Sequence, residues 1–212
     1  MKNVAIYGKG GLGRELADVV LRINPNAKII FIDDFDFNNE TIFSFNYIKE
    51  NLVEFLTFEF AVAIGDIYPA IELRNKLSEL GVKFATIIDP SVIISSSASI
   101  STGVLIFQNS WIGPNVVIEK NCIINASTVV GHDIIVREDS IISSGVKIGG
   151  GAIIGPQAYA GLGSIVLESI KIGKGSVLGA GAVLHKDLDD YLLAIGNPAR
   201  PVRKIDENFR LF

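Results

Sequence analysis

The sequence predicts an α/β N-terminal Rossmann-like βαβ domain followed by a left-handed parallel β-helix of hexapeptide repeats. Three observations predict it: a glycine-rich turn after a short apolar strand, an alternation of strands and helices over about 85 residues, and an apolar period of six from Ile88 onward. We expect the first domain to span residues 1–86 and the β-helix, with a C-terminal extension, to span residues 87–212.

Short apolar strands and amphipathic helices alternate through the first domain. Pro25 is expected to end the first helix, and Gly81 is expected to cap the C-terminus of the second. Because strands that alternate with helices pair through right-handed crossovers, one parallel sheet is predicted. Residues 35–58 are expected to hold a loop and a weak helix. The predicted strands are Val4–Tyr7, Lys28–Ile32, Phe60–Ile64 and Val82–Ile88, and the predicted helices are Arg14–Ile23 and Pro69–Leu80.

A large aliphatic residue recurs at every sixth position from Ile88 to Leu184. Of the 17 positions in this series, 16 carry Ile, Val or Leu, and the other is Ala160. Four residues after each of the first 16 of them comes a small or β-branched residue, such as Cys122. A period held this long predicts a triangular prism, in which three hexapeptides form one coil and the aliphatic side chains point inward.

Composition excludes several classes of protein. The mean hydropathy is +0.41, yet Gly, Ser, Asp or Asn breaks each apolar run well before the roughly 18 to 20 residues that a membrane span needs. The N-terminus is too rich in glycine for a signal peptide. The formal net charge of −4 argues against a nucleic-acid partner, which would require a basic surface.

The chain holds one cysteine, Cys122, and two histidines, His132 and His185. A single cysteine permits neither a disulfide framework nor a cysteine metal cluster, and it fits a reducing, cytoplasmic setting. A metal hydratase of the γ-carbonic anhydrase kind needs three histidine ligands, so we expect no metal. We expect His185, which follows the last repeat, to be exposed at the end of the solenoid.

The residues of the glycine turn allow two interpretations. Gly8, Gly10 and Gly13 match a G-x-G-x-x-G pattern between a strand and a helix, and Asp33 lies 20 residues after Gly13. This is the dinucleotide-binding fingerprint, in which loop amides and a helix N-terminus hold a pyrophosphate. The roughly 85 residues available are short for a full two-half Rossmann domain. A structural tight turn is the other interpretation.

His132 is the candidate for catalysis. It is the third residue of its hexapeptide, so it should point outward from the prism beside Asp133. A lone histidine is often only a surface residue or a satisfied core residue, but a neutral imidazole beside a carboxylate can serve as a general base. Gly150 lies 18 residues later, which places it one strand spacing of about 4.8 Å from His132 along the prism axis.

The ordered set of motifs resembles one family. A β-helix of hexapeptides followed by Gly196-Asn197-Pro198-Ala199-Arg200 resembles the hexapeptide acyltransferases. Together with the motifs of the front half, it is similar to the bacterial sialic acid O-acetyltransferase family, which includes nucleotide-amino-sugar N-acetyltransferases of the bacillosamine and perosamine type. These motifs are Gly8-Lys9-Gly10-Gly11-Leu12-Gly13-Arg14-Glu15, Phe31-Ile32-Asp33-Asp34, Ala63-Ile64-Gly65-Asp66, Asp89-Pro90-Ser91 and His132-Asp133.

The resemblance implies roles for these residues. His132 and Asp133 would supply the catalytic base, and the Gly150 amide would support the acetyl carbonyl as its oxyanion forms. Asn125 matches a position that contacts the acceptor sugar, although it equally suits the cap of a solenoid turn. The family often carries a second histidine nine residues after the first, and this chain has Ile141 there.

The resemblance also implies two binding regions. The sugar diphosphate would lie near the glycine loop, and its nucleoside would lie near Asp33, Asp34 or Gly65. The segment from Gly196 would border the coenzyme A groove. The residues concerned are Gly8, Gly10, Gly11, Gly13, Asp33, Asp34 and Gly65 for the nucleotide sugar, and Gly150, Gly196, Asn197, Pro198 and Arg200 for acetyl-CoA.

The function that the resemblance implies is an acetyl-CoA-dependent N-acetyltransferase. It would act on a nucleotide-linked 4-amino sugar for surface-glycan biosynthesis, such as lipopolysaccharide or capsule, in the cytoplasm. Transfer would be direct, because no serine or cysteine is placed as a nucleophile beside a base. The alternatives are an O-acetyltransferase on a sialic-acid-like hydroxyl and a non-catalytic nucleotide-sugar scaffold. A homotrimer is implied. The outward apolar residues Phe107, Trp111 and Tyr159 would suit a contact between prisms, and they could equally cover the prism locally.

Overall fold

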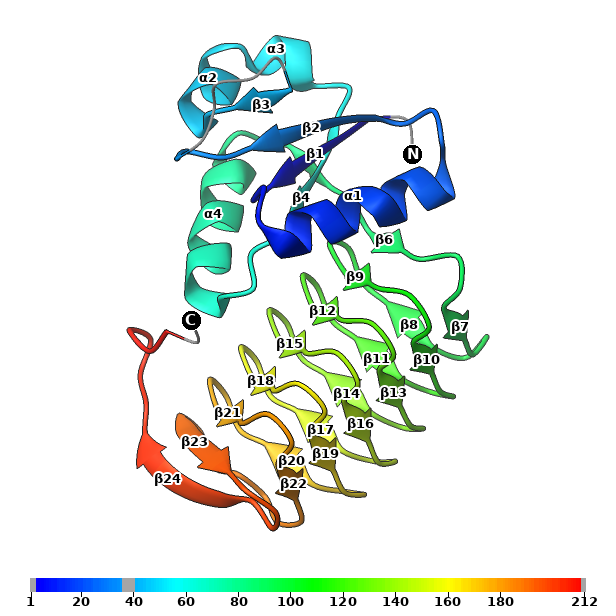
Figure 1. The fold of residues 1–212 in the computed structure, drawn as a ribbon, viewed down its shortest axis with the longest axis vertical. Coiled ribbons are helices and arrows are strands. Elements are labelled where there is room, and N and C mark those ends of the chain that lie inside the picture. Colours follow the sequence, from blue (N-terminus) through cyan, green and yellow to red (C-terminus); the bar gives the residue numbers. More distant parts are fainter. Residues whose placement is uncertain (1–2, 36–40, 211–212) are drawn as a thin grey trace. The chain divides into compact units, whose positions relative to one another are not determined.

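The predicted parallel sheet forms in the N-terminal part of the chain. The computed structural model describes residues 3–35 and 41–210, and the chain divides into two units, Met1–Ile87 and Ile88–Phe212. In the first unit, five strands pair in parallel in the order β3-β2-β1-β4-β5 (Figure 1). These strands are β1 (Asn3–Tyr7), β2 (Lys28–Ile32), β3 (Ile42–Phe43), β4 (Glu59–Val62) and β5 (Lys83–Phe84).

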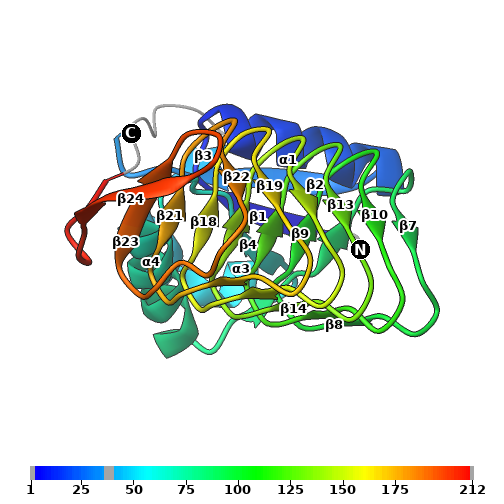
Figure 2. The same cartoon turned by 90° about the horizontal axis from the view of Figure 1, so that it is seen from below.

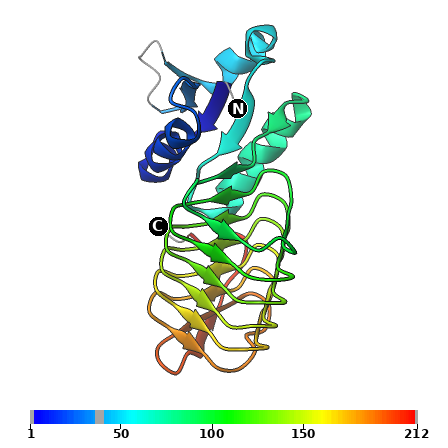
Figure 3. The same ribbon diagram turned by 90° about the vertical axis from the view of Figure 1, so that its right-hand side faces the viewer.

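Helices cover both faces of this sheet. The crossovers from β1 to β2 and from β4 to β5 run in opposite directions, so right-handed connections put their helices on opposite faces (Figure 3). On one side, Leu16, Val19 and Val20 of the first helix are buried. On the other, the remaining helices share one core with Tyr7 and Phe60. The helices are α1 (Gly11–Ile23), α2 (Phe45–Glu50), α3 (Leu52–Phe55) and α4 (Ile67–Glu79).

Three details of the first unit differ from the prediction. The expected strand Val82–Ile88 is wrong, since residues 85 and 86 separate β5 from β6 (Ile87–Ile88), and β6 already belongs to the next sheet. Strand β3 lies within residues 35–58, where a loop and a weak helix were expected, because two residues are too few to show a strand period. Helix α1 begins three residues earlier than predicted, inside the glycine turn, because Gly10 is extended and serves as its N-cap.

The hexapeptide period is confirmed as a left-handed β-helix. Seventeen two-residue strands run through the described residues from β6 to β22, and each ends on the aliphatic residue of the predicted series. Strands pair in parallel with the strand 18 residues later, as Trp111 does with Val129. One coil is therefore three hexapeptides, and Figure 1 shows the coils stacked one on another.

The prism has three faces. Face 1 contains β7 (Ile93–Ile94), β10 (Trp111–Ile112), β13 (Val129–Val130), β16 (Lys147–Ile148), β19 (Ile165–Val166) and β22 (Val183–Leu184). Face 2 contains β8 (Ser99–Ile100), β11 (Val117–Ile118), β14 (Ile135–Val136), β17 (Ile153–Ile154) and β20 (Lys171–Ile172). Face 3 contains β6, β9 (Leu105–Ile106), β12 (Ile123–Ile124), β15 (Ile141–Ile142), β18 (Tyr159–Ala160), β21 (Val177–Leu178), β23 (Leu192–Ile195) and β24 (Arg200–Lys204).

The aliphatic ladders fill the prism. Ile112, Ile118 and Ile124 of one coil are each fully buried, which explains how a chain of high mean hydropathy hides its apolar surface. Cys122 lies between β11 and β12, at a corner of the prism, with no exposed surface. Phe107 is 1% exposed, so it adds no apolar surface for a contact between prisms and fits the alternative of local cover.

The last two strands form an antiparallel hairpin at the C-terminal end of the prism (Figure 2). Strand β23 continues face 3 in parallel with β21, and β24 folds back along β23 as the edge strand. The hairpin thus covers the last parallel strand edge of face 3, which would otherwise expose unpaired backbone groups.

Candidate functional site

His132 and Asp133 lie together at the corner where face 1 turns into face 2, called here the His corner. The His132 Nδ1 atom is 2.7 Å from Asp133 Oδ2, and the two side chains are 65% and 57% exposed. A carboxylate on Nδ1 favours the neutral tautomer that carries its proton there, which leaves a free lone pair on Nε2. Such an imidazole can accept a proton from an attacking nucleophile.

Gly150 lies directly against the His132 ring. A Cβ atom at Gly150 would stand 2.5 Å from both Cε1 and Nε2 of His132, so a residue with a side chain there would displace the ring. Among the described residues, no acceptor takes the Gly150 N–H. The corner therefore brings a basic nitrogen and a free backbone donor together, as coil arithmetic predicted for these two residues.

Asp133 is held on both sides. Its Oδ1 accepts a hydrogen bond from Asn115 Nδ2 at 2.9 Å, and its backbone N–H donates to Pro114 at 2.9 Å. The hydrogen bond from Asn115 lowers the pKa of Asp133, and the contact with His132 lowers it further. The carboxylate is thus kept ionised beside the imidazole. Sequence reasoning missed Asn115, although the 18-residue offset that found Gly150 also leads from Asp133 to Asn115.

A groove runs along the same corner toward the C-terminal coils. Its volume is about 540 Å³, and it starts at Gly149, next to Gly150. His185 lines its far end and is half-buried, so the expectation that His185 is exposed is wrong. Its Nε2 lies 3.3 Å from Nη1 of Arg200. The lining residues are Lys147, Ile148, Gly149, Ile165, Val166, Leu167, Glu168, Ile170 and His185.

Two residues singled out in the sequence lie away from the His corner. Asn125 follows β12 and sits where face 3 turns into face 1, and its backbone carbonyl accepts hydrogen bonds from Ser110 and Thr128. Ile141 belongs to β15 on face 3 and is 4% exposed. Within one chain, the structure therefore brings neither residue to His132.

The C-terminal motif forms the turn of the β23–β24 hairpin. Gly196 has a φ of +96°, a left-handed conformation that favours glycine, and the Asn197–Pro198 bond is cis. The carbonyl of Gly196 accepts a hydrogen bond from Val183, and Ala199 donates to the carbonyl of Val183. These bonds fasten the turn to face 1, and Arg200 beside it reaches His185 in the groove.

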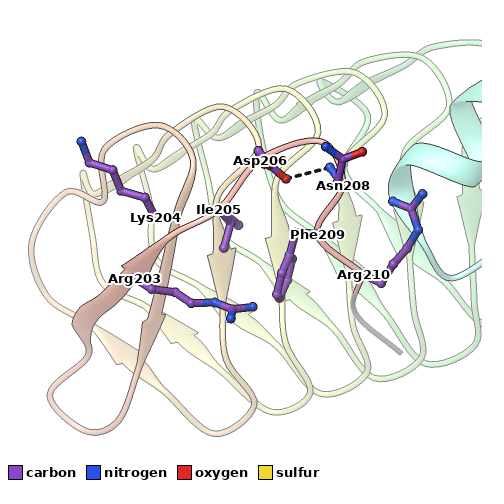
Figure 4. Close-up of a pocket in the computed structure, with 7 residues that line it drawn as sticks. All are labelled: Arg203, Lys204, Ile205, Asp206, Asn208, Phe209 and Arg210. Carbon is purple, nitrogen blue, oxygen red and sulfur yellow. Dashed lines mark hydrogen bonds between the residues drawn. The ribbon is translucent and has the colours of Figure 1, made fainter.

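A second hollow, of about 560 Å³, lies along the C-terminal segment (Figure 4). Arg203 lies over the Phe209 ring, 4.9 Å from its centroid. The hollow is lined by residues of β24 and the segment after it, and His132 and Gly150 are not among them. Its cations therefore do not contribute to the His corner.

The four glycines of the turn in the first unit form two pairs with different roles. Gly8 has a φ of +102°, and a Cβ at Gly13 would stand 1.8 Å from the Gly8 carbonyl oxygen, so these two allow the close approach of β1 and α1. Gly10 and Gly11 have no atom within 4 Å of an added Cβ. Their open side faces outward at the start of α1, where backbone N–H groups favour an anion.

The strand ends beside this turn meet at the point where the strand order reverses. Gly8 follows β1 and Gly65 follows β4, and in open α/β sheets ligands bind outside the carboxyl ends of strands at such a switch point. Asp33 and Asp34 follow β2. Asp33 accepts hydrogen bonds from the N–H groups of Lys9 and Phe35, at 3.4 and 3.0 Å.

Asp34 makes hydrogen bonds that hold the carboxyl end of the sheet together. Its Oδ1 accepts the Phe45 N–H at 2.8 Å, and its Oδ2 accepts the Tyr7 hydroxyl. Burial raises the pKa of the Tyr7 hydroxyl far above its usual value, and the hydrogen bond to Asp34 raises it further. Asp34 therefore ties β1 and α2 to the end of β2.

The described part of the chain contains neither a metal-ligand cluster nor a membrane-spanning helix. Within residues 3–35 and 41–210, no three His, Cys, Asp or Glu side chains cluster in a way that could hold a metal ion. No helix in these ranges has the length and apolarity to cross a membrane. Cys122, buried with its Sγ 3.0 Å from the Arg137 carbonyl oxygen, is not placed beside His132.

Comparisons with known proteins agree with this geometry. The family model described as the PglD N-terminal domain matches residues 3–79. A comparison with curated proteins gave no match. Among solved structures, the acetyltransferase domain of PglB from Neisseria gonorrhoeae is 27% identical, with a TM-score of 0.89 over 95% of this chain and 100% of that one. It has also been solved in complex with acetyl coenzyme A.

A second similar structure contains two bound molecules. PerB from Caulobacter crescentus, in complex with CoA and GDP-perosamine, is 27% identical, with a TM-score of 0.86 over 96% of this chain and 98% of that one. WeeI from Acinetobacter baumannii, at 23% identity and a TM-score of 0.72, shares the fold. The fold of this chain, over 95 to 96% of its length, is therefore similar to that of all three structures.

Proposed function

We propose that the chain is an acetyl-CoA-dependent acyltransferase of the nucleotide-amino-sugar N-acetyltransferase kind, and that it acetylates the amino group of a nucleotide-linked 4-amino sugar with His132 as general base. The match to the PglD N-terminal domain and the similarity to PglB and PerB support this proposal. The observation that carries this proposal is the His132 ring, which is oriented by Asp133 and lies against Gly150 with its Nε2 free. Surface-glycan biosynthesis, such as that of lipopolysaccharide or capsule, is the pathway class that such a product would enter.

Each group of the His corner takes one part of the reaction. The acceptor amine attacks the thioester carbonyl and gives a proton to His132 Nε2, while Asp133 stabilises the imidazolium that forms. The free Gly150 N–H donates to the developing oxyanion. The C–S bond then breaks, the thiolate of coenzyme A leaves, and the proton on His132 is available to it. No covalent acyl-enzyme is needed.

Acetyl-CoA is proposed to lie in the groove beside Gly150. The groove begins next to the proposed oxyanion donor, and its apolar lining suits the pantetheine arm. Arg200, whose guanidinium reaches His185 at the far end, is suited to a phosphate. Gly196, Asn197 and Pro198 form the turn that holds Arg200 there. Ile141 supplies no side-chain donor to the acyl carbonyl, which leaves that task to Gly150.

The nucleotide sugar is proposed to bind at the switch point of the first unit. Gly10 and Gly11 leave room for a diphosphate at the start of α1, supported by the turn that Gly8 and Gly13 permit. Gly65, Asp33 and Asp34 border the same edge of the sheet and would meet the nucleoside. Asn125 is proposed to contact the acceptor sugar.

A homotrimer in the cytoplasm completes the proposal. Asn125 and His132 occupy different corners of one prism, so a shared site for both requires a second copy of the chain. Trp111 is 39% exposed on face 1, and Tyr159 is part-exposed on face 3; both suit a contact between prisms. The one cysteine, Cys122, is buried, which fits a reducing compartment.

Mass spectrometry tests the reaction directly. The protein is incubated with acetyl-CoA and a panel of UDP-, dTDP- and GDP-linked 4-amino sugars, beside His132→Ala. We expect one amino sugar to gain one acetyl group, and the variant to lose at least about 100-fold in rate, the usual value of a positioned base. His185→Ala removes the other histidine, which lines the proposed acetyl-CoA groove, and so separates the loss of donor binding from the loss of the base. Acetylation of sialic-acid-like hydroxyls instead would establish the O-acetyltransferase, and binding without any product would establish the scaffold.

A further inference from the structure

A hydrogen-bonded chain of side chains extends from the His corner into the preceding coil. Both oxygens of Asp133 are used, Oδ2 by His132 Nδ1 and Oδ1 by Asn115 Nδ2 at 2.9 Å. Asn115 is itself fixed, since its backbone N–H donates to Ser97 Oγ at 3.0 Å. A carboxylate held at one oxygen presents its other oxygen in a defined direction, so the orientation of the imidazole depends on Asn115 as well as on Asp133.

We propose that Asn115 is a positioning residue for the reaction, holding the Asp133 carboxylate in the rotamer that directs His132 Nδ1 toward Asp133 and Nε2 toward Gly150. The proposal rests on the function proposed above for His132. Asn115 and Asp133 share the same left-handed corner conformation, with φ values of 57° and 56°. Equivalent backbones one coil apart place the amide of one residue on the carboxylate of the other.

The same contact occurs elsewhere in the prism without a histidine. At the corner where face 2 turns into face 3, Asn121 Nδ2 donates to Asp139 Oδ1 at 3.1 Å, and both residues have positive φ values of 61° and 58°. A hydrogen bond from Asn to Asp between neighbouring coils therefore occurs at two corners of the prism. Of these two pairs, the one at the His corner is the one whose acceptor also holds an imidazole. This second pair is a matched control for the structural part of any effect.

The ionisable surroundings of Asp133 are simple. On its own corner it meets His132, and on the preceding coil it meets Asn115 and Pro114. On the following coil, the residues 18 positions beyond His132 and Asp133 are Gly150 and Gly151, which carry no charge. An aspartate at position 115 would thus place a second negative charge beside Asp133 with little change of shape.

The test compares two pairs of variants, Asn115→Gly and Asn115→Asp with Asn121→Gly and Asn121→Asp. Glycine and aspartate both tolerate the left-handed conformation, so folding is preserved. We expect the Asn115 variants to lose roughly 10-fold in kcat, as mutations of outer-shell partners do, with KM unchanged for both substrates. The Asn121 variants should stay within about 2-fold, since they leave the His132–Asp133 geometry intact.

The pH profile supplies a readout that a purely structural role would not move. In Asn115→Asp, the added negative charge favours the protonated imidazole, so the acid limb of kcat/KM moves to higher pH, by roughly half a unit at an exposed site. Asn121→Asp adds the same charge at another corner and should leave the limb in place. Equal profiles for the two aspartate variants would overturn the proposal.

A spectroscopic measurement separates this proposal from the proposed function. The chain has two histidines, so ¹⁵N-histidine spectra resolve both rings, and His185→Ala assigns them. In the wild type, His132 should show the tautomer protonated at Nδ1, and in Asn115→Gly the two tautomers should mix. If no acceptor is acetylated but the tautomers change, only the proposed function fails. If acetylation occurs and the Asn115 variants match the Asn121 variants in rate and tautomer, only the role of Asn115 fails.

Discussion

A methyl group on Gly150 would occupy the space in which the His132 ring lies. The added Cβ would stand 2.5 Å from Nε2, well inside van der Waals contact, and the exposed ring would rotate away. Gly150 has no positive φ, so alanine is tolerated by the backbone. We expect Gly150→Ala to lower kcat/KM by roughly 100-fold, because displacing a catalytic group by about 1 Å costs that much, with the melting temperature nearly unchanged.

A double-mutant cycle tests whether the methyl acts through His132. If it does, Gly150→Ala adds little to the loss already caused by His132→Ala, and the two effects are strongly non-additive. Additive losses would mean that the methyl group acts elsewhere, for example on acetyl-CoA in the groove. Steady-state kinetics of the two single variants and the double variant decide between these outcomes.

Residues of the His corner differ in how far the sequence could reveal them. His132 and Gly150 could be paired from the sequence because the coil length is fixed by the repeat. The orientation of the His132 ring could not be predicted from the sequence, since it depends on which oxygen of Asp133 accepts the hydrogen bond from Asn115. The hexapeptide period could not predict that His185 is half-buried either, because the β23–β24 hairpin follows the last repeat and brings Arg200 against it.

Within the element α1, two glycines two residues apart should respond to alanine in opposite ways. A Cβ at Gly13 would stand 1.8 Å from the Gly8 carbonyl oxygen, so Gly13→Ala must separate α1 from β1 and should destabilise by about 3 kcal/mol. Gly11 lies in the first turn with open space around it, so Gly11→Ala should stabilise by about 0.5 kcal/mol. All helices of the described residues belong to the first unit.

Helical circular dichroism therefore reports on the stability of that unit. For a protein of this size, 1 kcal/mol shifts the melting temperature by about 2 to 4 °C. A lower melting temperature for Gly13→Ala and a slightly higher one for Gly11→Ala are expected. Equal responses would show that the tight approach of α1 to β1 is not what Gly13 provides.

Elements were predictable where a period or a turn residue marked them. The strands of the β-helix follow the aliphatic series without a slip, and β2 has the predicted bounds. The strand expected over Val82–Ile88 failed because a continuous apolar run does not show where the chain leaves one sheet for another. Strand β3, of two residues, is defined only by its pairing with Phe31 and Ile32 of β2.

On the scale of the whole molecule, the prism is a one-dimensional stack in which each coil contacts only its neighbours. Ile142 of β15 lies between Ile124 and Ala160 in the strand register and is fully buried. Ile94 of β7, in the first coil, pairs with Ile112 on one side and is only partly buried. Stability in such a stack comes from these nearest-neighbour interfaces.

Two truncations should therefore differ with their place in the stack. Ile142→Ala leaves a cavity with neighbours on both sides and should cost about 4 kcal/mol. Ile94→Ala removes a side chain that already meets solvent, and about 1 to 2 kcal/mol is expected. The single tryptophan, Trp111, lies in β10 of the prism, so its fluorescence during urea unfolding reports on this unit alone. Equal losses for the two variants would mean that the first coil is as tightly packed as the middle, contrary to the partial burial of Ile94.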